Sequence, residues 1–385
     1  MRFGTVTSVS PGICTVKVAG GEIPVIYLKG GAPTKGDFVA VHRQGVVSYL
    51  LNPPSGGLLM FGGSTTGNIV ALVSPQSGAA ASPVSLPVPS GYGLLLDAAP
   101  LGPGFALVPL FGPTLTTGML LKLTLPSLSV AASVDCAGLQ IASANSISGV
   151  VACFVSSSAT GGGFSGMALV DASLAQPTYD FPQILNNVTA AWDESADLLW
   201  VLAQPADNAS APFQVLSLDP ASGAYSAPFE PFPASAVHPF SGQVIDFASH
   251  LMFVADYLVA QGYVVDLSTG SLVATIPLEG NASSGFAAVD QVRHNWYVPV
   301  STASGGLQVI STESYATVAS IPFPESLNEV SNLLADDAKG AIYIGADAST
   351  GTTPDYDVLI TVDEIALART ATVPTGDWEG PWLLG

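Results

Sequence analysis

The feature that most constrains the fold of this chain is a strand–turn–strand pattern that returns about every 48 residues from residue 57 onward. Its clearest copy is GYVVDLSTGSLVATIPLEG, residues 262–280, where two alternating apolar segments flank a turn at residues 268–270. Such a segment predicts a β-hairpin. Seven copies share one apolar position, 45 to 52 residues apart, occupied by Ile69, Leu121, Leu169, Leu216, Val265, Ile310 and Ile360.

A second pattern precedes most of these hairpins and consists of a strand, a turn that begins with Asp or Asn, and an apolar strand. The segment GQVIDFASHLMFVADY, residues 242–257, is a clear copy. Six turns share this first position, occupied by Asp97, Asn145, Asp193, Asp246, Asp290 and Asp336. Four strands in about 48 residues have the period and content of a β-propeller blade. Because one blade cannot bury both of its faces, such blades must stack around a closed ring.

Ring closure explains the apolar end of the chain. The first unit supplies GLLMFGG and a hairpin but has no innermost strand, whereas GPWLLG, residues 380–385, resembles the innermost strands of other units. We therefore predict an all-β fold in which residues 58–385 form a seven-bladed β-propeller. Its first blade is completed by a C-terminal strand that contains Trp382, Leu383 and Leu384.

The later repeats resemble the YVTN-type seven-bladed propellers, in which a strand of the type YVVD followed by TGSLVATIPLEG recurs, as it does at residues 263–280. The resemblance covers most of residues 184–376. It implies a fold and says little about chemistry, because propellers host many functions.

The turn aspartates have two interpretations, a ring of ligands or a set of residues that cap their own turns. The second is more common, because an Asp or Asn side chain readily accepts a hydrogen bond from the backbone two residues on. Acidic pairs at Asp336 and Asp337 and at Asp355 and Asp357 lack the spacing of a calcium loop. We therefore expect neither a metal nor a cofactor.

Residues 1–51 read as five short strands, which predicts a small OB-like or SH3-like barrel. The segment NPPSGG, residues 52–57, reads as a short stiff linker. Residues 1–54 hold five basic and two acidic residues, a net charge of +3, which leaves −23 for the rest of a chain whose total is −20. The four aromatic residues of the barrel lie in predicted strands, where core packing uses them, so we expect no nucleic-acid binding.

Residues 4–41, GTVTSVSPGICTVKVAGGEIPVIYLKGGAPTKGDFVAV, resemble the OB-type N-terminal domain of minor tail proteins of tailed phages, notably those that infect actinobacteria. The shared pattern is GTVxxV, CTVxV, a strand with proline, and GDxVxV. The resemblance implies that residues 1–51 dock a distal module onto other tail proteins of the virion, in a multi-copy ring or other homo-oligomer.

Composition further narrows the classes of protein to which this chain could belong. The chain is 48% hydrophobic and 10% charged, with 40 Gly and 30 Pro, which favours many short strands. Gly and Pro interrupt every apolar run before it reaches the length of a membrane span, and residues 1–10 do not resemble a signal peptide. Cys14, Cys136 and Cys153 lie far apart in apolar segments and read as buried thiols.

These observations lead us to expect a non-enzymatic structural component of a phage tail, made in the host cytoplasm, whose propeller contacts proteins or a host-surface glycan. Two alternatives stay open, a glycan-binding or glycan-cleaving propeller and a cellular YVTN-like scaffold. Candidate contact residues are Tyr92, Tyr257 and Trp378, aromatics predicted in loops that join strands, where a ring could stack on a sugar. The simpler interpretation is that they pack between blades.

Overall fold

The structure is a computed structural model of the 385-residue chain. It describes residues 2–10, 13–18, 21–26, 38–44, 47–50, 58–62, 69–73, 80–94, 98–101, 104–114, 116–125, 127–145, 148–157, 163–208, 211–233, 239–256, 258–282, 287–301, 305–323, 327–336, 340–348, 356–376 and 378–383. Within these ranges every regular element is a β-strand, as expected for an all-β chain.

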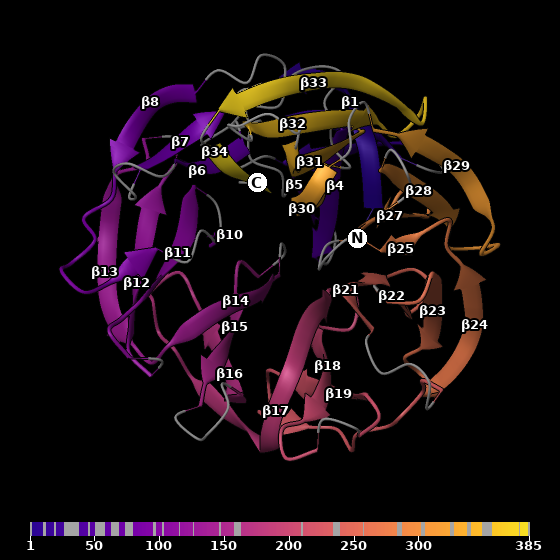
Figure 1. Cartoon of the computed structure of the whole chain (residues 1–385). Coiled ribbons are helices and arrows are strands. Elements are labelled where there is room, and N and C mark those ends of the chain that lie inside the picture. The colour runs from indigo at the N-terminus through magenta and orange to yellow at the C-terminus, as the bar shows by residue number, and fades with distance from the viewer. Residues whose placement is uncertain are drawn as a thin grey trace.

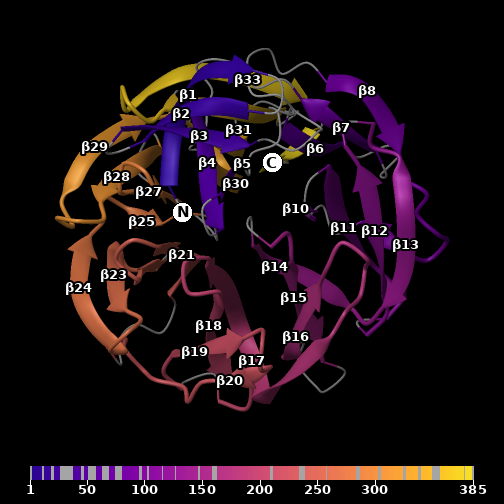
Figure 2. The same cartoon turned by 180° about the vertical axis from the view of Figure 1, so that it is seen from behind.

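The N-terminal strands form a closed barrel in the order β1-β2-β3-β5-β4, in which β3 and β5 are parallel and the other pairs antiparallel. Seen from behind, in Figure 2, these strands are drawn in front of the ring formed by the rest of the chain. The barrel strands are β1 (Arg2–Ser10), β2 (Ile13–Val18), β3 (Gly21–Ile26), β4 (Phe38–Gln44) and β5 (Val47–Leu50).

The remaining strands form antiparallel sheets arranged around a common centre (Figure 1). One sheet joins the two ends of this region, because the C-terminal β34 pairs with β6. Its strands are, in spatial order, β34 (Trp378–Leu383), β6 (Leu58–Gly62), β7 (Ile69–Val73) and β8 (Ala80–Ser85). The next sheet contains β9 (Gly93–Leu94), β10 (Ala99–Pro100), β11 (Phe105–Phe111), β12 (Gly118–Thr124) and β13 (Val130–Cys136).

A seven-stranded sheet follows, and it continues through the long strand β17. Residues 178–180 of β17 pair with β16 and residues 189–193 pair with β18, with register shifts between the two stretches. The strands are β14 (Leu139–Ala144), β15 (Val151–Ser156), β16 (Phe164–Val170), β17 (Thr178–Asp193), β18 (Leu198–Pro205), β19 (Gln214–Asp219) and β20 (Ala224–Tyr225).

Three further sheets complete the ring. The first contains β21 (Pro239–Asp246), β22 (Leu251–Asp256), β23 (Gln261–Asp266) and β24 (Ser271–Pro277). The second contains β25 (Asn281–Ala282), β26 (Ala288–Asp290), β27 (Asn295–Ser301), β28 (Gly306–Ser311) and β29 (Thr317–Pro322). The third contains β30 (Leu327–Asp336), β31 (Ala341–Ala348), β32 (Tyr356–Asp363) and β33 (Ala368–Gly376).

All seven predicted hairpins are confirmed as antiparallel pairs. The shared apolar position lies on the first strand of each, and it is buried wherever its side chain is described, from Leu121 to Ile360. Each hairpin therefore places its first strand in the core and leaves its second strand at the rim, where exposed side chains of β24 alternate with half-buried or buried ones.

The hydrophobic core lies between neighbouring sheets. Phe253 on β22, for example, shares one cluster with Trp296 on β27 of the next sheet, and their ring centroids are 5.5 Å apart. The two halves of the seven-stranded sheet also share a cluster, which joins Met167 on β16 to Val201 on β18. Faces that pack against each other in this way fit the radial stacking of a β-propeller.

The cysteine prediction is confirmed in part. Cys153 is fully buried, whereas Cys136 is a free thiol that is only half-buried, so the prediction of burial is wrong there. Cys136 lies at the end of β13, a rim strand whose other side chains are mostly exposed, because the next sheet does not cover the rim. The side chain of Cys14 lies outside the described residues.

Candidate functional site

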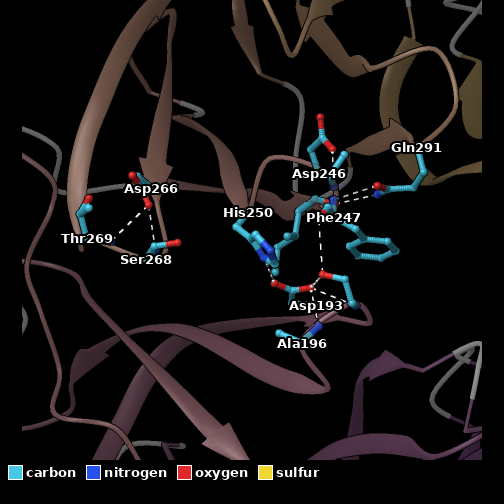
Figure 3. Close-up of polar contacts among 12 residues, drawn as sticks. Asp193, Ala196, Asp246, Phe247, His250, Asp266, Ser268, Thr269 and Gln291 are labelled. Atoms are coloured by element: carbon cyan, nitrogen blue, oxygen red, sulfur yellow. Dashed lines mark hydrogen bonds and ion pairs between the residues drawn. The ribbon is translucent and has the colours of Figure 1, made fainter. Parts of the chain in front are cut away.

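The turns that join innermost strands to their neighbours are built on the predicted Asp or Asn residue. Asp193 is the last residue of β17, and its Oδ1 accepts hydrogen bonds from the backbone N–H groups of Ser195 and Ala196, at 3.0 and 3.2 Å (Figure 3). Asn145, Asp246 and Asp290 cap their own turns in the same way. The interpretation that these residues cap turns is therefore confirmed for these four, which we call the inner-turn residues.

The second carboxylate oxygen of two inner-turn residues contacts the next sheet. Asp193 Oδ2 lies 2.9 Å from His250 Nδ1, and Asp246 Oδ2 lies 3.2 Å from His294 Nδ1. Thr312 Oγ1 also donates to Asp246 Oδ2, at 2.6 Å. Both carboxylates are buried, whereas the His250 side chain is 45% exposed. Each contact thus links a buried anion of one sheet to a side chain at the surface end of the next.

The residues that contact these aspartates lie at the same position of their own turns and share a left-handed backbone conformation. His250 and His294 are each the fourth residue after the turn Asp of their own sheet, and their φ angles are 54° and 56°. Asp197 has a φ of 53° at the equivalent position, where two other turns carry Gly149 and Gly340. Left-handed backbone disfavours side chains. A non-glycine residue here therefore places a side chain where it can reach the preceding sheet.

We call each contact between the inner turns of neighbouring sheets a junction. In one junction the donor and the acceptor are exchanged between the earlier and the later turn. Asn145 Nδ2 donates to Asp197 Oδ1 at 3.4 Å, so the amide is in the earlier turn and the carboxylate in the later one. In the next two junctions the carboxylate is in the earlier turn and histidine in the later one. Each of these junctions therefore pairs a carboxylate with a group that can donate to it.

The junction after Asp290 uses an arginine. Arg293 Nη1 bonds Asp290 Oδ2 at 3.0 Å and Glu364 Oε2 at 2.6 Å, and both carboxylates are buried. Burial opposes the charge of Arg293, but the hydrogen bond and charge of Asp290, with the charge of Glu364, outweigh it and raise the arginine pKa. A Cβ atom on Gly340 would lie 3.1 Å from Arg293 Nη2. The glycine therefore leaves the space that the guanidinium uses.

Two glutamines join the edges of innermost strands. Gln291 Nε2 donates to the carbonyl of Ile245 at 2.7 Å, and its Oε1 accepts from the N–H of Phe247 at 2.9 Å (Figure 3). Gln243 Nε2 donates to the carbonyl of Trp200 at 2.7 Å, and its Oε1 accepts from Thr189 Oγ1 at 3.0 Å. Each amide thus bonds the sheet that precedes its own, Gln291 through two backbone groups and Gln243 through a backbone carbonyl and a threonine hydroxyl.

A hollow of about 300 Å³ lies among the innermost strands β14, β17, β21 and β26. It is lined by Ala142, Ser143, Ala144, Ala190, Ala191, Trp192, Glu194, Gln243, Val244, Ile245, Phe247, Val289 and Gln291. Glu194 is the one ionisable side chain of this lining. The inner-turn residues themselves are not part of it.

The candidate contact residues are not brought together by the described structure. Tyr92 is half-buried and packs against the cluster around Leu86 and Val108, so its ring contributes to packing. Tyr257 and Leu384 lie outside the described residues. Trp378, Trp382 and Leu383 lie on β34, where Trp382 pairs with Leu59 and Leu383 with Leu58.

No group of three or more His, Cys, Asp or Glu side chains in the described ranges is placed to hold a metal ion. Asp97, Asp337 and Asp355 lie outside those ranges. No helix of the described chain could span a membrane.

The residues that the inner-turn side chains contact in the next sheet were not predicted from the sequence. Aligning the inner turns shows a signal that could have found them, because the fourth residue after the Asp or Asn is histidine in DFASH and DQVRH, aspartate in DESAD, and glycine in NSISG and DDAKG. A non-glycine residue at a position that elsewhere holds glycine indicates that its side chain has a use. That use becomes visible when two turns are placed side by side.

Comparisons with known proteins address the fold alone. No protein family and no curated protein matches this sequence. The dihydro-heme d1 dehydrogenase NirN in complex with DHE matches 98% of this chain and 74% of its own, with 12% identity and a TM-score of 0.51. A chain of the mitotic checkpoint complex matches 76% of this chain and 86% of its own, with 14% identity and a TM-score of 0.50. In all, 1105 chains of solved structures match. One fold can host many functions, so the likeness supports a β-propeller and assigns no function.

Proposed function

We propose that this protein is a structural component of a phage tail, with no catalytic role. The barrel, residues 1–51, docks onto other tail proteins, and the ring, residues 58–385, is presented for contact with proteins or the host surface. The barrel order β1-β2-β3-β5-β4, with β3 parallel to β5, supports an OB-type assignment for the segment that resembles minor tail proteins. The difference in charge, +3 against −23, supports separate roles for the two parts.

We further propose that the ring has seven blades and is closed by β34. The register shifts within β17, and the core shared by β16 and β18, support a bend that makes this strand the outermost of one blade and the innermost of the next. The pairing of β34 with β6 supports closure by the C-terminal strand.

The observation that carries the non-catalytic role is the state of the inner-turn carboxylates. Asp193, Asp246 and Asp290 are buried and bonded both within their own turns and to a cationic or polar side chain. Glycosidases need two carboxylates that face a shared substrate space. Here the hollow is lined by one carboxylate, that of Glu194, and the aspartates serve to join sheets. A rigid ring of this kind is suited to presenting a surface for contact with proteins or the host.

The test is immunogold labelling of purified phage particles with antibodies raised against the full chain. We expect gold at the tail in electron micrographs, and no gold on particles treated with pre-immune serum. If the antibodies detect the protein in infected-cell lysates but label no purified particle, the virion assignment is wrong and a cellular scaffold is favoured. Release of oligosaccharides from host wall polysaccharide by the purified chain would contradict the non-catalytic role.

A further inference from the structure

Phe111, the last residue of β11, carries the one exposed aromatic ring among the side chains that the structure describes. The residue is 48% exposed, whereas its neighbour Leu110 is fully buried in the cluster between sheets. Phe111 does not belong to that cluster. Packing between sheets therefore does not account for the position of this ring.

The exposed ring is held in place by a glycine. Phe111 pairs with Gly93 of β9, and a Cβ atom on Gly93 would lie 2.1 Å from Phe111 Cζ and 2.5 Å from Cε1. The ring thus rests on the Gly93 backbone, in space that any other side chain would need. A ring that is already positioned loses little conformational entropy when a ligand stacks on it.

The loop after β11 adds threonine hydroxyls next to this strand. The N–H of Gly112 donates to the carbonyl of Thr117 at 2.8 Å and closes the loop. Thr117 Oγ1 donates to the carbonyl of Thr114 at 3.1 Å and lies 3.0 Å from Thr114 Oγ1. Because Thr117 has one hydroxyl proton, Thr114 is the donor of this second bond. Thr114 and Thr116 are exposed, so lone pairs of their hydroxyls can accept from a ligand.

The surroundings of the ring are uncharged. Residues 98–121, which include β11 and its loop, contain no Asp, Glu, Lys, Arg or His. The turn at residues 89–92, closed by a bond from the Tyr92 N–H to the Pro89 carbonyl, is also uncharged. It runs beside the loop because β9 and β11 are antiparallel. A charged ligand would find no partner of opposite sign here, which favours a neutral one.

Phe111 lies on the side of the sheets that is turned away from the barrel. The chain enters the ring at Leu58, beside the C-terminal end of β34, which is the edge where other sheets carry their inner turns. β11 begins after a turn at residues 101–105 of this same edge and ends at Phe111, on the opposite one. The barrel strands are drawn behind the sheets in Figure 1 and in front of them in Figure 2.

We propose that Phe111, with the hydroxyls of Thr114 and Thr116, binds a neutral pyranose ring of an oligosaccharide. The C–H groups of a sugar face carry slight positive charge and suit the negative face of an aromatic ring. The sugar hydroxyls can donate to the threonines, and such a mixture of aromatic and polar groups is typical of small-molecule sites. An apolar protein surface would need a wider apolar patch, whereas Gly112, Pro113 and Thr114 follow the ring.

The inference deepens the proposed function and rests on it for the source of the sugar, a host-surface glycan. The first test is isothermal titration calorimetry of the full chain with cellobiose, lactose and cellobiouronic acid, in which a carboxylate replaces one hydroxymethyl group of cellobiose. We expect a neutral disaccharide to bind, and the acid to bind about threefold or more weakly than the better neutral one. No detectable binding of either neutral disaccharide, or tighter binding of the acid, would overturn the proposal.

The second test separates the aromatic face from apolar volume. Phe111→Leu keeps an apolar side chain and should weaken binding by about threefold to tenfold. The double variant Thr114→Val/Thr116→Val removes both hydroxyls and should weaken it by about threefold or more. Leu258→Ala, at an exposed apolar residue in the turn between β22 and β23, is the control and should bind normally. Circular dichroism and melting curves identify a variant that fails to fold, and unchanged affinity in folded Phe111→Leu would show the proposal to be wrong.

The two proposals fail in different ways. Gold labelling of phage tails without binding of either neutral disaccharide would reject the sugar site and leave the tail assignment standing. Disaccharide binding that requires Phe111, without labelling of any particle, would support the sugar site and reject the tail assignment. If no disaccharide binds, and wild type but not Phe111→Ser self-associates in analytical ultracentrifugation, the ring contacts a second copy of the chain and the sugar site is wrong.

Discussion

At the scale of single residues, the fourth position of each inner turn decides how two sheets are joined. His250 and His294 adopt a left-handed backbone that glycine adopts more easily, and each contacts a buried aspartate of the preceding sheet. The local conformational cost, of order 1 kcal/mol, is offset by a hydrogen bond to a charged group. Where the fourth residue is Gly340, Arg293 of the preceding sheet occupies the space instead.

Asp246→Ala should destabilise the protein strongly. The change removes the cap of its turn and leaves His294 and Thr312 without their shared acceptor, so we expect a loss of about 2 to 4 kcal/mol in the free energy of unfolding. Differential scanning calorimetry should show a lower Tm. The matched control is Asp219→Ala, which removes contacts within one exposed turn and should cause a smaller loss. Equal effects would mean that the contacts between sheets contribute little.

Ser222→Ala should raise the pKa of Asp219. Hydrogen bonds from the Ser222 hydroxyl and then from the Ala221 N–H hold this pKa below its usual value. A carboxyl with a lowered folded-state pKa stabilises the protein above its unfolded pKa of about 3.9, and this contribution is lost as pH falls through the folded value. The Tm difference between wild type and variant should therefore be present at neutral pH and shrink in acid.

Carboxyl NMR titration checks the same variant directly. Asp266 serves as the internal control, because its pKa is also lowered, against the effect of desolvation, by the N–H groups of Ser268 and Thr269 in a separate turn. We expect the Asp266 value to stay unchanged. A variant in which the pKa of Asp219 does not move would show that the Ser222 hydroxyl does not stabilise the carboxylate.

At the scale of elements, each inner turn that carries a carboxylate faces a neighbouring turn that carries a hydrogen-bond donor. The Asn145 amide faces the Asp197 carboxylate, whereas Asp193 and Asp246 face histidines. Two carboxylates in one junction would repel each other at this distance. The sequence of each turn is therefore constrained by the turn of its neighbour as well as by its own backbone.

Asn145→Asp should destabilise this junction by about 1 to 3 kcal/mol at pH 7, because it places a second carboxylate beside Asp197 at a buried position. Adding Asp197→His should recover most of the loss, because it reproduces the arrangement of Asp193 and His250. A double-mutant cycle from denaturant unfolding measures the coupling, which we expect to exceed about 1 kcal/mol. Additive effects of the two changes would contradict pairing across the junction.

At the scale of the whole molecule, the first and last strands of the ring lie in one sheet. Trp378 pairs with Gly62 and Leu383 with Leu58, so the ends of a sequence of more than 300 residues meet edge to edge. Without β34, the backbone groups of β6 that it pairs with would face solvent. An unpaired edge of this kind favours association with other chains.

Truncation after Gly376 should therefore lower the Tm and cause aggregation, measured by calorimetry and by light scattering. Removal of Gly385 alone is the control and should have no effect, because β34 ends at Leu383. A truncated chain that stays monomeric with an unchanged Tm would show that the C-terminal strand does not close the ring.

The described structure tests some of the inferences from sequence and leaves others as predictions. The hairpins and the capping role of Asp193, Asp246 and Asp290 were predictable, because each depends on residues a few positions apart. The contacts of His250, His294 and Arg293 were not, because each joins residues that are close only after sheets stack. The half-exposure of Cys136 was missed for the same reason, since burial on a rim strand depends on the neighbouring sheet.

The sequence by itself determined the local structure of this protein, because strand alternation, turn chemistry and a repeated period are short-range properties of the chain. Only the tertiary structure decided which turn faces which, that Gln291 holds Phe247 across two sheets, and that a hollow with one carboxylate lies among the innermost strands. These features depend on the distances between segments about 50 residues apart. Such distances follow from the packing of whole sheets, which no single repeat contains.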